Sequence, residues 1–205
     1  MERVYLDNGA TTKVDARVAE AALQAMTAAW GNPSSAHALG VEAARLLTRA
    51  REQVARALSA DPAELSFTSG GTEANQLGIL GAARAARGRH LVVSAFEHPS
   101  VLDAARRLAQ DGWELTEVAP EKNGVVSVER LAAAVRADTG VVALMWVQNE
   151  LGTVQPIEAA ARAVKAKAPR CHLHVDAVQA LGKLAVDVGL GFDSLALSAH
   201  KLHGP

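Results

Sequence analysis

The feature that most constrains the fold of this chain is an alternation of alanine-rich segments with short runs of valine and leucine. The valine and leucine runs have the length of β-strands, and the segments between them carry apolar residues at helical spacing. The run at residues 141–147 is almost entirely apolar, as expected for a strand that is buried on both faces. The alternation predicts an α/β fold of three layers, in which a mostly parallel sheet lies between two layers of helices.

The expected elements can be assigned to residue ranges. We expect strands at residues 65–68, 91–95, 114–118, 141–147, 172–176 and 194–198. We expect helices after Asp15 to about residue 29 and at 41–58, 73–86, 100–110, 128–137 and 157–168. Asp15 is a good N-cap for the first helix. Residues 5–33 precede the alternation and are rich in Asn, Gly and Thr, so we expect them to lie outside the main sheet.

Composition and charge exclude several classes of function. The net charge of -1 leaves no electrostatic footprint for nucleic acid, and aromatic residues, at 3%, are too few for base-stacking platforms. The chain has no apolar stretch of membrane-spanning length, and its first residues lack the apolar core of a signal peptide. The single cysteine, Cys171, excludes an internal disulfide framework. We therefore expect a cytoplasmic protein with neither nucleic acid nor membrane as a partner.

Polar residues directly after the strands are the first candidates for a site, because ligands of open parallel sheets bind at the carboxyl ends of the strands. After the strand at 65–68, Gly70, Gly71, Thr72 and Glu73 open a helix. Two glycines and the free N–H groups of a helix N-terminus can form a cradle for a phosphate. A plain helix cap is an equally good interpretation. The sequence has neither a Rossmann fingerprint nor a Walker loop.

Two further polar residues follow strands. His98 comes after the strand at 91–95, and Pro99 next to it suits the first turn of a helix. A lone histidine is more often structural than catalytic. Asn149 follows the most apolar strand, where it could also be only a turn residue before Gly152.

The segment at 174–179 is more informative. Asp176 ends a parallel strand and Gln179 follows three residues later, and a buried carboxylate is costly unless its charge meets a partner. A protonated pyridine nitrogen is such a partner, and an aspartate beside it keeps the ring cationic and able to accept electrons. His172 and His174 alternate along the same strand face, but we expect no metal site because a third ligand is missing.

Lys201 lies in the last five residues of the chain. A lysine whose pKa is lowered by its surroundings can form a Schiff base with pyridoxal phosphate (PLP). The hydroxyl of Ser198 and the imidazole of His200 could bond the phosphate oxygens. A surface lysine is the simpler interpretation of Lys201 taken alone. Because the glycine loop, Asp176 and Gln179 all fit the same ligand, the set predicts a PLP site that includes Lys201.

Together these motifs resemble the class V aminotransferase superfamily of fold-type I PLP enzymes, and within it the cysteine desulfurases of the NifS/IscS type. The resemblance covers essentially the whole chain and includes residues 5–12, 31–37, 97–99 and 149–152. It implies conversion of L-cysteine to L-alanine, with the sulfur left as a persulfide on an enzyme cysteine. The sulfur would then pass to scaffold-type acceptor proteins that serve iron–sulfur cluster, thiolated tRNA or cofactor assembly.

The same resemblance implies a role for each candidate residue. Lys201 would form the Schiff base and later abstract the α-proton of the substrate. Asp176 would pair with the pyridine nitrogen, and Gln179 would bond the phenolic oxygen of the ring. His98 would stack on the ring and assist proton transfer, and Asn149 would lie near the ring oxygen and the substrate carboxylate. The phosphate would be held by Gly71, Thr72, Ser198 and His200.

Chain length is the main departure from the family, whose members are nearly twice as long. The resemblance implies a seven-stranded sheet whose last strand follows the lysine, so we expect a sheet that is incomplete at the C-terminus and a strand at 65–68 without its neighbour. We expect residues 1–14 to associate with a small domain and residues 15–205 to form a partial large domain. We interpret Cys171 as a structural thiol. The chain is expected to be a fragment of a homodimeric enzyme that is inactive alone.

Two other functions stay open at this point. A selenocysteine lyase, or another class V lyase or aminotransferase, would share the PLP residues and differ mainly beyond residue 205. A function of another class is that of an inert half-domain that acts only in binding or dimerisation. Light absorption by bound PLP that is lost in Lys201→Ala would separate the enzymes from the inert half-domain.

Overall fold

The computed structural model describes residues 3–205, which divide into two compact units. One consists of the chain up to Phe67 together with Ala199–Pro205, and the other of Thr68–Ser198. We call them the helical unit and the α/β unit. The assignment of residues 1–14 to a separate small domain stays a prediction.

The α/β unit is built on a sheet of five parallel strands in the order β2-β1-β3-β4-β5. This confirms the predicted α/β fold with a mostly parallel sheet. Because the chain goes outward from β1 to β2 and returns to the other side of β1 for β3, the strand order reverses between β1 and β3. The strands are β1 (His90–Ser94), β2 (Glu114–Val118), β3 (Thr139–Met145), β4 (His172–Asp176) and β5 (Ser194–Ala196).

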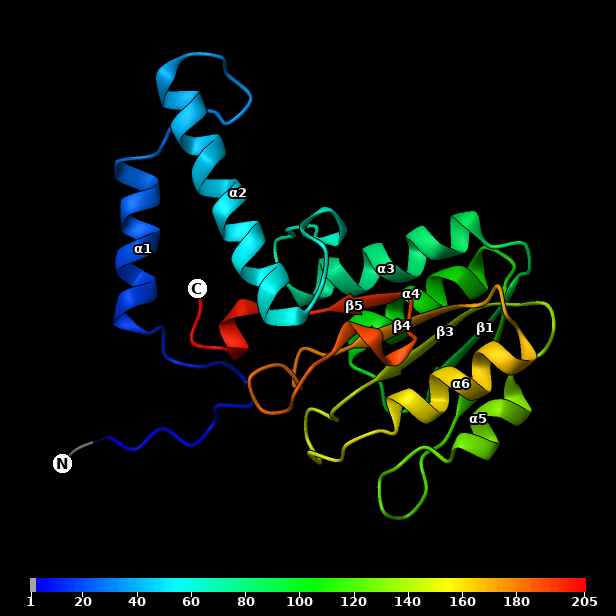
Figure 1. The fold of residues 1–205 in the computed structure, drawn as a ribbon. Helices are drawn as coiled ribbons and strands as arrows, with labels where there is room; N and C mark the ends of the chain where they lie inside the picture. The colour runs from blue at the N-terminus through cyan, green and yellow to red at the C-terminus, as the bar shows by residue number, and fades with distance from the viewer. Residues whose placement is uncertain (1–2) are drawn as a thin grey trace. The chain divides into compact units, whose positions relative to one another are not determined.

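Helices cover both faces of this sheet, as the alternation in the sequence predicts (Figure 1). Alternate residues of β3 face opposite layers, so Val141 and Ala143 contact one core and Val142 and Leu144 the other. One layer is formed by α3 (Gly71–Ala85) and α4 (Pro99–Gln110), and the other by α5 (Val128–Ala134) and α6 (Ile157–Lys167). A short 3-10 helix, η2 (Val188–Leu190), precedes β5.

The expected strand at residues 65–68 is not formed, and that prediction is wrong. The segment follows a short 3-10 helix, η1 (Pro62–Glu64), and pairs with no strand among residues 3–205. An extended segment becomes a strand only when a neighbour takes up its backbone hydrogen bonds. The segment also crosses the boundary between the units, since Phe67 belongs to one and Thr68 to the other.

The helical unit contains two long helices with capped N-termini. α1 (Ala16–Thr27) begins after Asp15, whose side chain accepts the N–H of Arg17 at 2.9 Å, and this confirms the predicted cap. α2 (Ala38–Leu58) begins after His37, whose Nδ1 accepts the N–H of Gly40 at 3.3 Å. Large apolar side chains on these helices are exposed, among them Leu23, Met26, Leu46 and Leu47.

The last residues of the chain belong to the helical unit, where they bond to its first residues. A single 3-10 turn, η3 (Ala199–Lys201), contains the predicted lysine. Both the backbone N–H and the hydroxyl of Thr12 donate to the carbonyl of His200, at 2.9 and 2.8 Å. These bonds fix the backbone beside Lys201.

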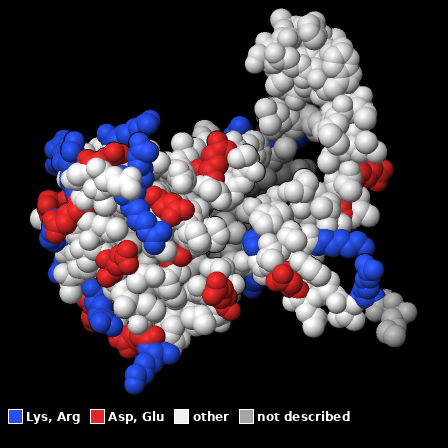
Figure 2. Space-filling model, turned by 180° about the vertical axis from the view of Figure 1, so that it is seen from behind, with Lys and Arg blue, Asp and Glu red and all other residues white. Residues whose placement is uncertain are grey.

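The surface is mixed in charge. On the face drawn in Figure 2, basic and acidic side chains of the α/β unit are interspersed rather than gathered by sign. Among the described residues, none of the helices has both the length and the apolar character needed to cross a bilayer.

Candidate functional site

Most of the predicted site residues lie at the carboxyl ends of the strands in the α/β unit, as the topology predicts. His98 follows β1, Asn149 follows β3, and Asp176 is the last residue of β4. Gln179 lies in the turn after β4, and Ser198 follows β5. The parallel strands therefore bring side chains from four separate parts of the sequence to one edge of the sheet.

Asp176 is a buried carboxylate held by hydrogen-bond donors. Asp176 is only 5% exposed. The amide of Asn75 donates to its Oδ2 at 2.8 Å, and the backbone N–H of Val178 donates to its Oδ1 at 3.0 Å. An ionised carboxylate accepts hydrogen bonds without donating any, so both contacts suit the charged form. The free-energy cost of burying this carboxyl group is thus offset by its hydrogen bonds to Asn75 and Val178.

Asn75 was given no role by the sequence, although it contacts Asp176 directly. It lies on the buried stripe of α3 together with Ile79 and Ala83, at intervals of four residues. An asparagine on an otherwise apolar stripe is the signal that could have identified it, because a buried amide needs partners. Besides Asp176, it bonds the hydroxyl of Ser100 at 2.9 Å.

His98 is connected to the same group of residues. It is the N-cap of α4, and its Nδ1 accepts the backbone N–H of Ser100 at 3.1 Å and lies 2.8 Å from the Ser100 hydroxyl. Its ring is otherwise exposed. Because Ser100 bonds Asn75, a continuous path of hydrogen bonds joins His98 to Asp176.

The N-terminus of α3 has the features of an anion cradle. No side chain caps this helix in the described chain, and the exposed Thr72 lies in its first turn. Glu73 folds back instead, and its Oε2 accepts the backbone N–H and the hydroxyl of Ser69 at 2.6 and 2.7 Å. A Cβ on Gly71 would lie 2.9 Å from Val178 Cγ2 and 3.5 Å from Ser198 Cβ, so the close approach of these segments requires glycine.

Gln179 and Asn149 lie in the loops after β4 and β3. Gln179 is buried, and its Oε1 accepts a bond from Lys183 Nζ at 2.9 Å. Asn149 is half-buried beside Gln148, whose Oε1 accepts two backbone N–H groups of the loop at 2.6 Å each. Gln148 therefore fixes the loop that carries Asn149.

Lys201 and His200 are described within the helical unit. Lys201 Nζ donates to the carbonyl oxygens of Gly9 and Ala10, the latter at 2.7 Å. His200 Nδ1 lies 3.1 Å from the hydroxyl of Thr11. Partial burial lowers the pKa of His200, and the positive charge of Lys201 lowers it further. The roles of both residues toward a cofactor stay predictions.

Glu97 is a second residue whose importance the sequence did not reveal. It is buried, and its Oε1 accepts bonds from the Ser94 hydroxyl and from the backbone N–H of Met145. Its Oε2 has no hydrogen-bond partner in the described part of the chain. Burial raises the pKa of Glu97 to about 8, and the nearby charge of Asp176 also raises it. Glu97 is therefore a neutral acid at pH 7.

The two histidines of β4 contact one serine. His172 Nε2 and His174 Nδ1 each lie 2.7 Å from Ser194 Oγ. Within residues 3–205, no group of three or more His, Cys, Asp or Glu side chains is placed to hold a metal ion.

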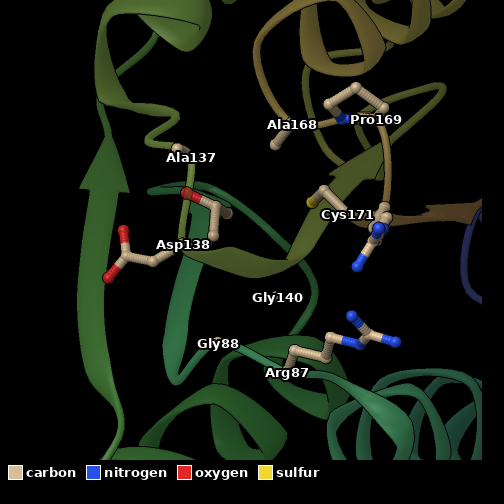
Figure 3. Close-up of a pocket in the computed structure, with 10 residues that line it drawn as sticks. Arg87, Gly88, Ala137, Asp138, Gly140, Ala168, Pro169 and Cys171 are labelled. Atoms are coloured by element: carbon tan, nitrogen blue, oxygen red, sulfur yellow. The ribbon is translucent and has the colours of Figure 1, made fainter.

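A cavity of about 370 Å³ lies away from these residues, at the amino ends of the strands. Figure 3 shows Arg87 and Cys171 on opposite sides of it. None of the predicted PLP-site residues lines this cavity. Cys171 is buried in its wall, and burial raises the pKa of the thiol to about 12, as expected for a structural cysteine.

Comparison with curated proteins finds cysteine desulfurases. The chain is 46% identical to cysteine desulfurase IscS of Vibrio vulnificus (strain YJ016) over 208 residues, which is 98% of this chain and 51% of the relative. It is 45% identical to IscS of Neisseria meningitidis serogroup C (strain 053442) over 206 residues, 98% of this chain and 50% of the relative. The chain spans about half the length of the curated relatives it matches.

Solved structures agree with this comparison. A NifS-like protein superposes with a TM-score of 0.96 at 41% identity, over 100% of this chain and 57% of the other. SspA in complex with cysteine superposes with a TM-score of 0.91 at 35% identity, over 98% and 58% of the two chains. DndA from Streptomyces lividans superposes with a TM-score of 0.83 at 42% identity, over 98% of this chain and 57% of the other.

The family model of class-V aminotransferases matches residues 4–205, which is nearly the whole sequence. Enzymes of this family are in general PLP-dependent. The match agrees with the three-layer fold and with the desulfurase relatives. The chain belongs to the aminotransferase class-V family.

Proposed function

We propose that this chain carries the PLP-binding half of a cysteine desulfurase, an enzyme that converts L-cysteine to L-alanine and passes the sulfur to an enzyme cysteine. The desulfurase relatives support this proposal, as does the structure of SspA, which contains cysteine. The whole reaction is proposed for the protein in which these residues are joined to the region that the relatives have in addition.

The observation that carries the proposal is that one helix, α3, serves both ends of a single ligand site. Its uncapped N-terminus offers Gly71 and Thr72 to an anion, and one turn later Asn75 donates to the buried carboxylate of Asp176. PLP has the matching chemistry, with a phosphate at one end and a basic ring nitrogen at the other.

The residues present fit PLP. The first-turn N–H groups of α3 and the buried Ser198 suit a phosphate, and Gly71 lets the segment of Ser198 approach this helix end closely. Asp176 suits a protonated ring nitrogen, because its carboxylate is fixed in position and accepts hydrogen bonds. When bound, PLP supplies an electron sink that stabilises negative charge on the α-carbon of the substrate.

The chain's own residues would divide the remaining work. Asp176 would hold the ring nitrogen protonated, and Gln179 would donate to the phenolic oxygen of the ring. Lys201 Nζ would hold the cofactor covalently and later take the α-proton. His98 would cover the ring and assist the proton transfer, and Asn149 would orient the ring oxygen and the substrate carboxylate. Gly71, Thr72, Ser198 and His200 would bind the phosphate.

Sulfur transfer requires a reactive thiol, and Cys171 does not fit that role. It is the single cysteine of the sequence, it is buried, and its pKa of about 12 keeps it protonated. We therefore assign the sulfur-accepting cysteine to none of the 205 residues. A homodimer and acceptor proteins of the scaffold type are further parts of the proposal.

The test is a fusion of this chain to the C-terminal half of the Vibrio vulnificus relative, which is similar in sequence. With PLP and L-cysteine, the fusion should form alanine and sulfide in equal amounts when a reductant is present. Lys201→Arg keeps the charge but should abolish alanine formation, whereas Cys171→Ala should leave it within about twofold, because a buried thiol is not the nucleophile. Absence of alanine from a folded, PLP-loaded fusion would refute the proposal.

A further inference from the structure

We propose that Asn75 is a positioning residue, and that it ends a directional hydrogen-bond chain running from His172 through Ser194 and His174 to the carboxylate of Asp176. Every bond in this chain donates toward Asp176. The inference rests on the proposed function only where it assigns Asp176 to the ring nitrogen of PLP. The directions of the bonds follow from the donors and acceptors of the residues themselves.

The amide of Asn75 has only one consistent orientation. Its NH₂ group donates to Asp176 Oδ2 at 2.8 Å and to the Ser100 hydroxyl at 2.9 Å. The oxygen of the same amide then faces the ring of His174, with Oδ1 2.9 Å from Nε2. His174 Nε2 must therefore carry a hydrogen and donate to Asn75.

Because Nε2 of His174 is a donor, the role of the other ring nitrogen, Nδ1, is also determined. The ring is 1% exposed, and burial lowers the pKa of His174 to about 3, so it is neutral and carries one hydrogen. With that hydrogen on Nε2, Nδ1 is an acceptor. Ser194 Oγ lies 2.7 Å from Nδ1 and so donates its single hydrogen there.

The same reasoning extends the chain to its beginning. Because the hydroxyl hydrogen of Ser194 is used for His174, the contact of 2.7 Å between Ser194 Oγ and His172 Nε2 requires His172 to donate. Hydrogen bonds that point in one direction polarise one another and become stronger than isolated bonds. This hydrogen-bond chain thus polarises the amide of Asn75, which donates to Asp176 Oδ2 and holds it in place.

Asn75 also connects Asp176 with His98. Its second N–H donates to the hydroxyl of Ser100 at 2.9 Å, which leaves that hydroxyl to donate to His98 Nδ1 at 2.8 Å. The backbone N–H of Ser100 donates to the same nitrogen at 3.1 Å. A single buried amide therefore orients two of the residues that we assign to the cofactor.

The packing of α3 against β4 is adapted to this chain. A Cβ on Gly78, one turn after Asn75, would lie 2.5 Å from both Cε1 and Nδ1 of His174. Any larger residue would push the ring out of reach of the Asn75 oxygen. Glycine at this position lets the helix approach closely enough for the hydrogen bond of 2.9 Å.

The first test needs no cofactor and measures the tautomer of His174. Imidazole ¹⁵N chemical shifts of the wild-type protein should show the hydrogen of His174 on Nε2 and a bare Nδ1. In Ser194→Ala the hydrogen should stay on Nε2, because the Asn75 oxygen still accepts it, whereas in Asn75→Leu a measurable fraction should move to Nδ1. A wild-type His174 with its hydrogen on Nδ1 would overturn the inference, whether or not the protein binds PLP.

The second test compares PLP with 1-deaza-PLP, which has the same phosphate but no ring nitrogen. Equilibrium dialysis should show that the wild-type protein prefers PLP by about tenfold or more, because a hydrogen bond to a charged group contributes that much. Asn75→Leu should reduce this preference to within about threefold, and Ser194→Ala should reduce it about twofold. His90→Gln is the matched control, since His90 is equally buried but is bonded by Thr139 and Thr116 instead.

These outcomes separate the inference from the proposed function. If the wild-type protein binds neither ligand, the proposed function fails while the tautomer measurement still decides the inference. If PLP binds but Asn75→Leu and His90→Gln alter the preference equally, the positioning role is refuted and the proposed function stands. If Asn75→Leu does not fold, Ser194→Ala is the deciding variant. His174 should keep its hydrogen on Nε2, and the preference for PLP over 1-deaza-PLP should fall about twofold.

Discussion

The backbone N–H of Met145, the last residue of β3, donates a hydrogen bond of 2.7 Å to Oε1 of Glu97, which follows β1. This bond joins the carboxyl ends of two neighbouring strands at the point where the strand order reverses. Because Glu97 is buried and its pKa is raised to about 8, the acid is neutral at pH 7. The same edge of the sheet thus carries the neutral acid Glu97 and the carboxyl group of Asp176, whose oxygens accept hydrogen bonds from Asn75 and Val178.

Glu97 should make the stability of the protein depend on pH. Its pKa is higher in the folded state than its ordinary value of 4.5, so between pH 4.5 and about 8 the folded state binds more protons than the unfolded state. The free energy of unfolding should therefore fall as pH rises through this window, by at most about 1.4 kcal/mol per pH unit from this group. Urea unfolding at pH 5, 6.5 and 8 should show that Glu97→Gln loses this part of the slope.

An exposed carboxyl provides the control for that experiment. Glu117 lies on the surface of β2, so Glu117→Gln should keep the slope of the wild-type protein. Equal slopes for Glu97→Gln and the wild-type protein would show that Glu97 is ionised in the folded state, contrary to our account.

Two glycines of α3 should respond in opposite ways to alanine. Gly78→Ala would place a methyl group 2.5 Å from the ring of His174, and we expect a loss of about 1–3 kcal/mol from overpacking. Gly81 has no atom within 4 Å of the position of a Cβ, so Gly81→Ala should stabilise the helix by up to about 1 kcal/mol. Thermal and urea unfolding of both variants would measure the difference. A neutral or stabilising Gly78→Ala would contradict the close packing of α3 on His174.

The thiol of Cys171 should be unreactive in the folded protein. With a pKa of about 12 it is almost entirely protonated at pH 8, and its residue is 1% exposed. A disulfide reagent such as DTNB should therefore react with it only after unfolding in guanidinium chloride. Ala85→Cys, at the exposed end of α3, should add one thiol that reacts at once. Rapid reaction of native Cys171 would reopen a role for it in sulfur transfer.

A strand of the sheet could be predicted where its own residues and the turn residues beside it indicate its position. The strands at 114–118 and 172–176 have the bounds that the sequence predicts, because turn residues such as Gly112 and Pro169 precede them. The segment at 65–68 has the same kind of composition but is no strand. Whether this segment forms a strand depends on a neighbouring strand to pair with. The presence of that neighbour is a property of the tertiary structure and cannot be read from the residues of the segment.

The same distinction applies to the site. Asp176, His98 and Ser198 could be predicted because topology places the residues after parallel strands at one edge. The buried position of Asn75 could be predicted, but the roles of Asn75 and Glu97 could not, because these come from contacts between distant segments. Asn75 is 101 residues from Asp176 in the sequence, and Glu97 is 48 residues from Met145. Periodicity predicts which helix face is buried, but not which distant group a buried polar residue will meet.

The central claim is that Lys201 is the residue that holds PLP. After incubation with PLP, sodium borohydride fixes the cofactor to the amine that binds it, and mass spectrometry of a digest locates that amine. We predict that the label is found on the peptide that contains Lys201, that Lys201→Arg abolishes it, and that Lys183→Arg, beside Gln179, leaves it unchanged. A label spread over other lysines, and unaffected by Lys201→Arg, would contradict the account.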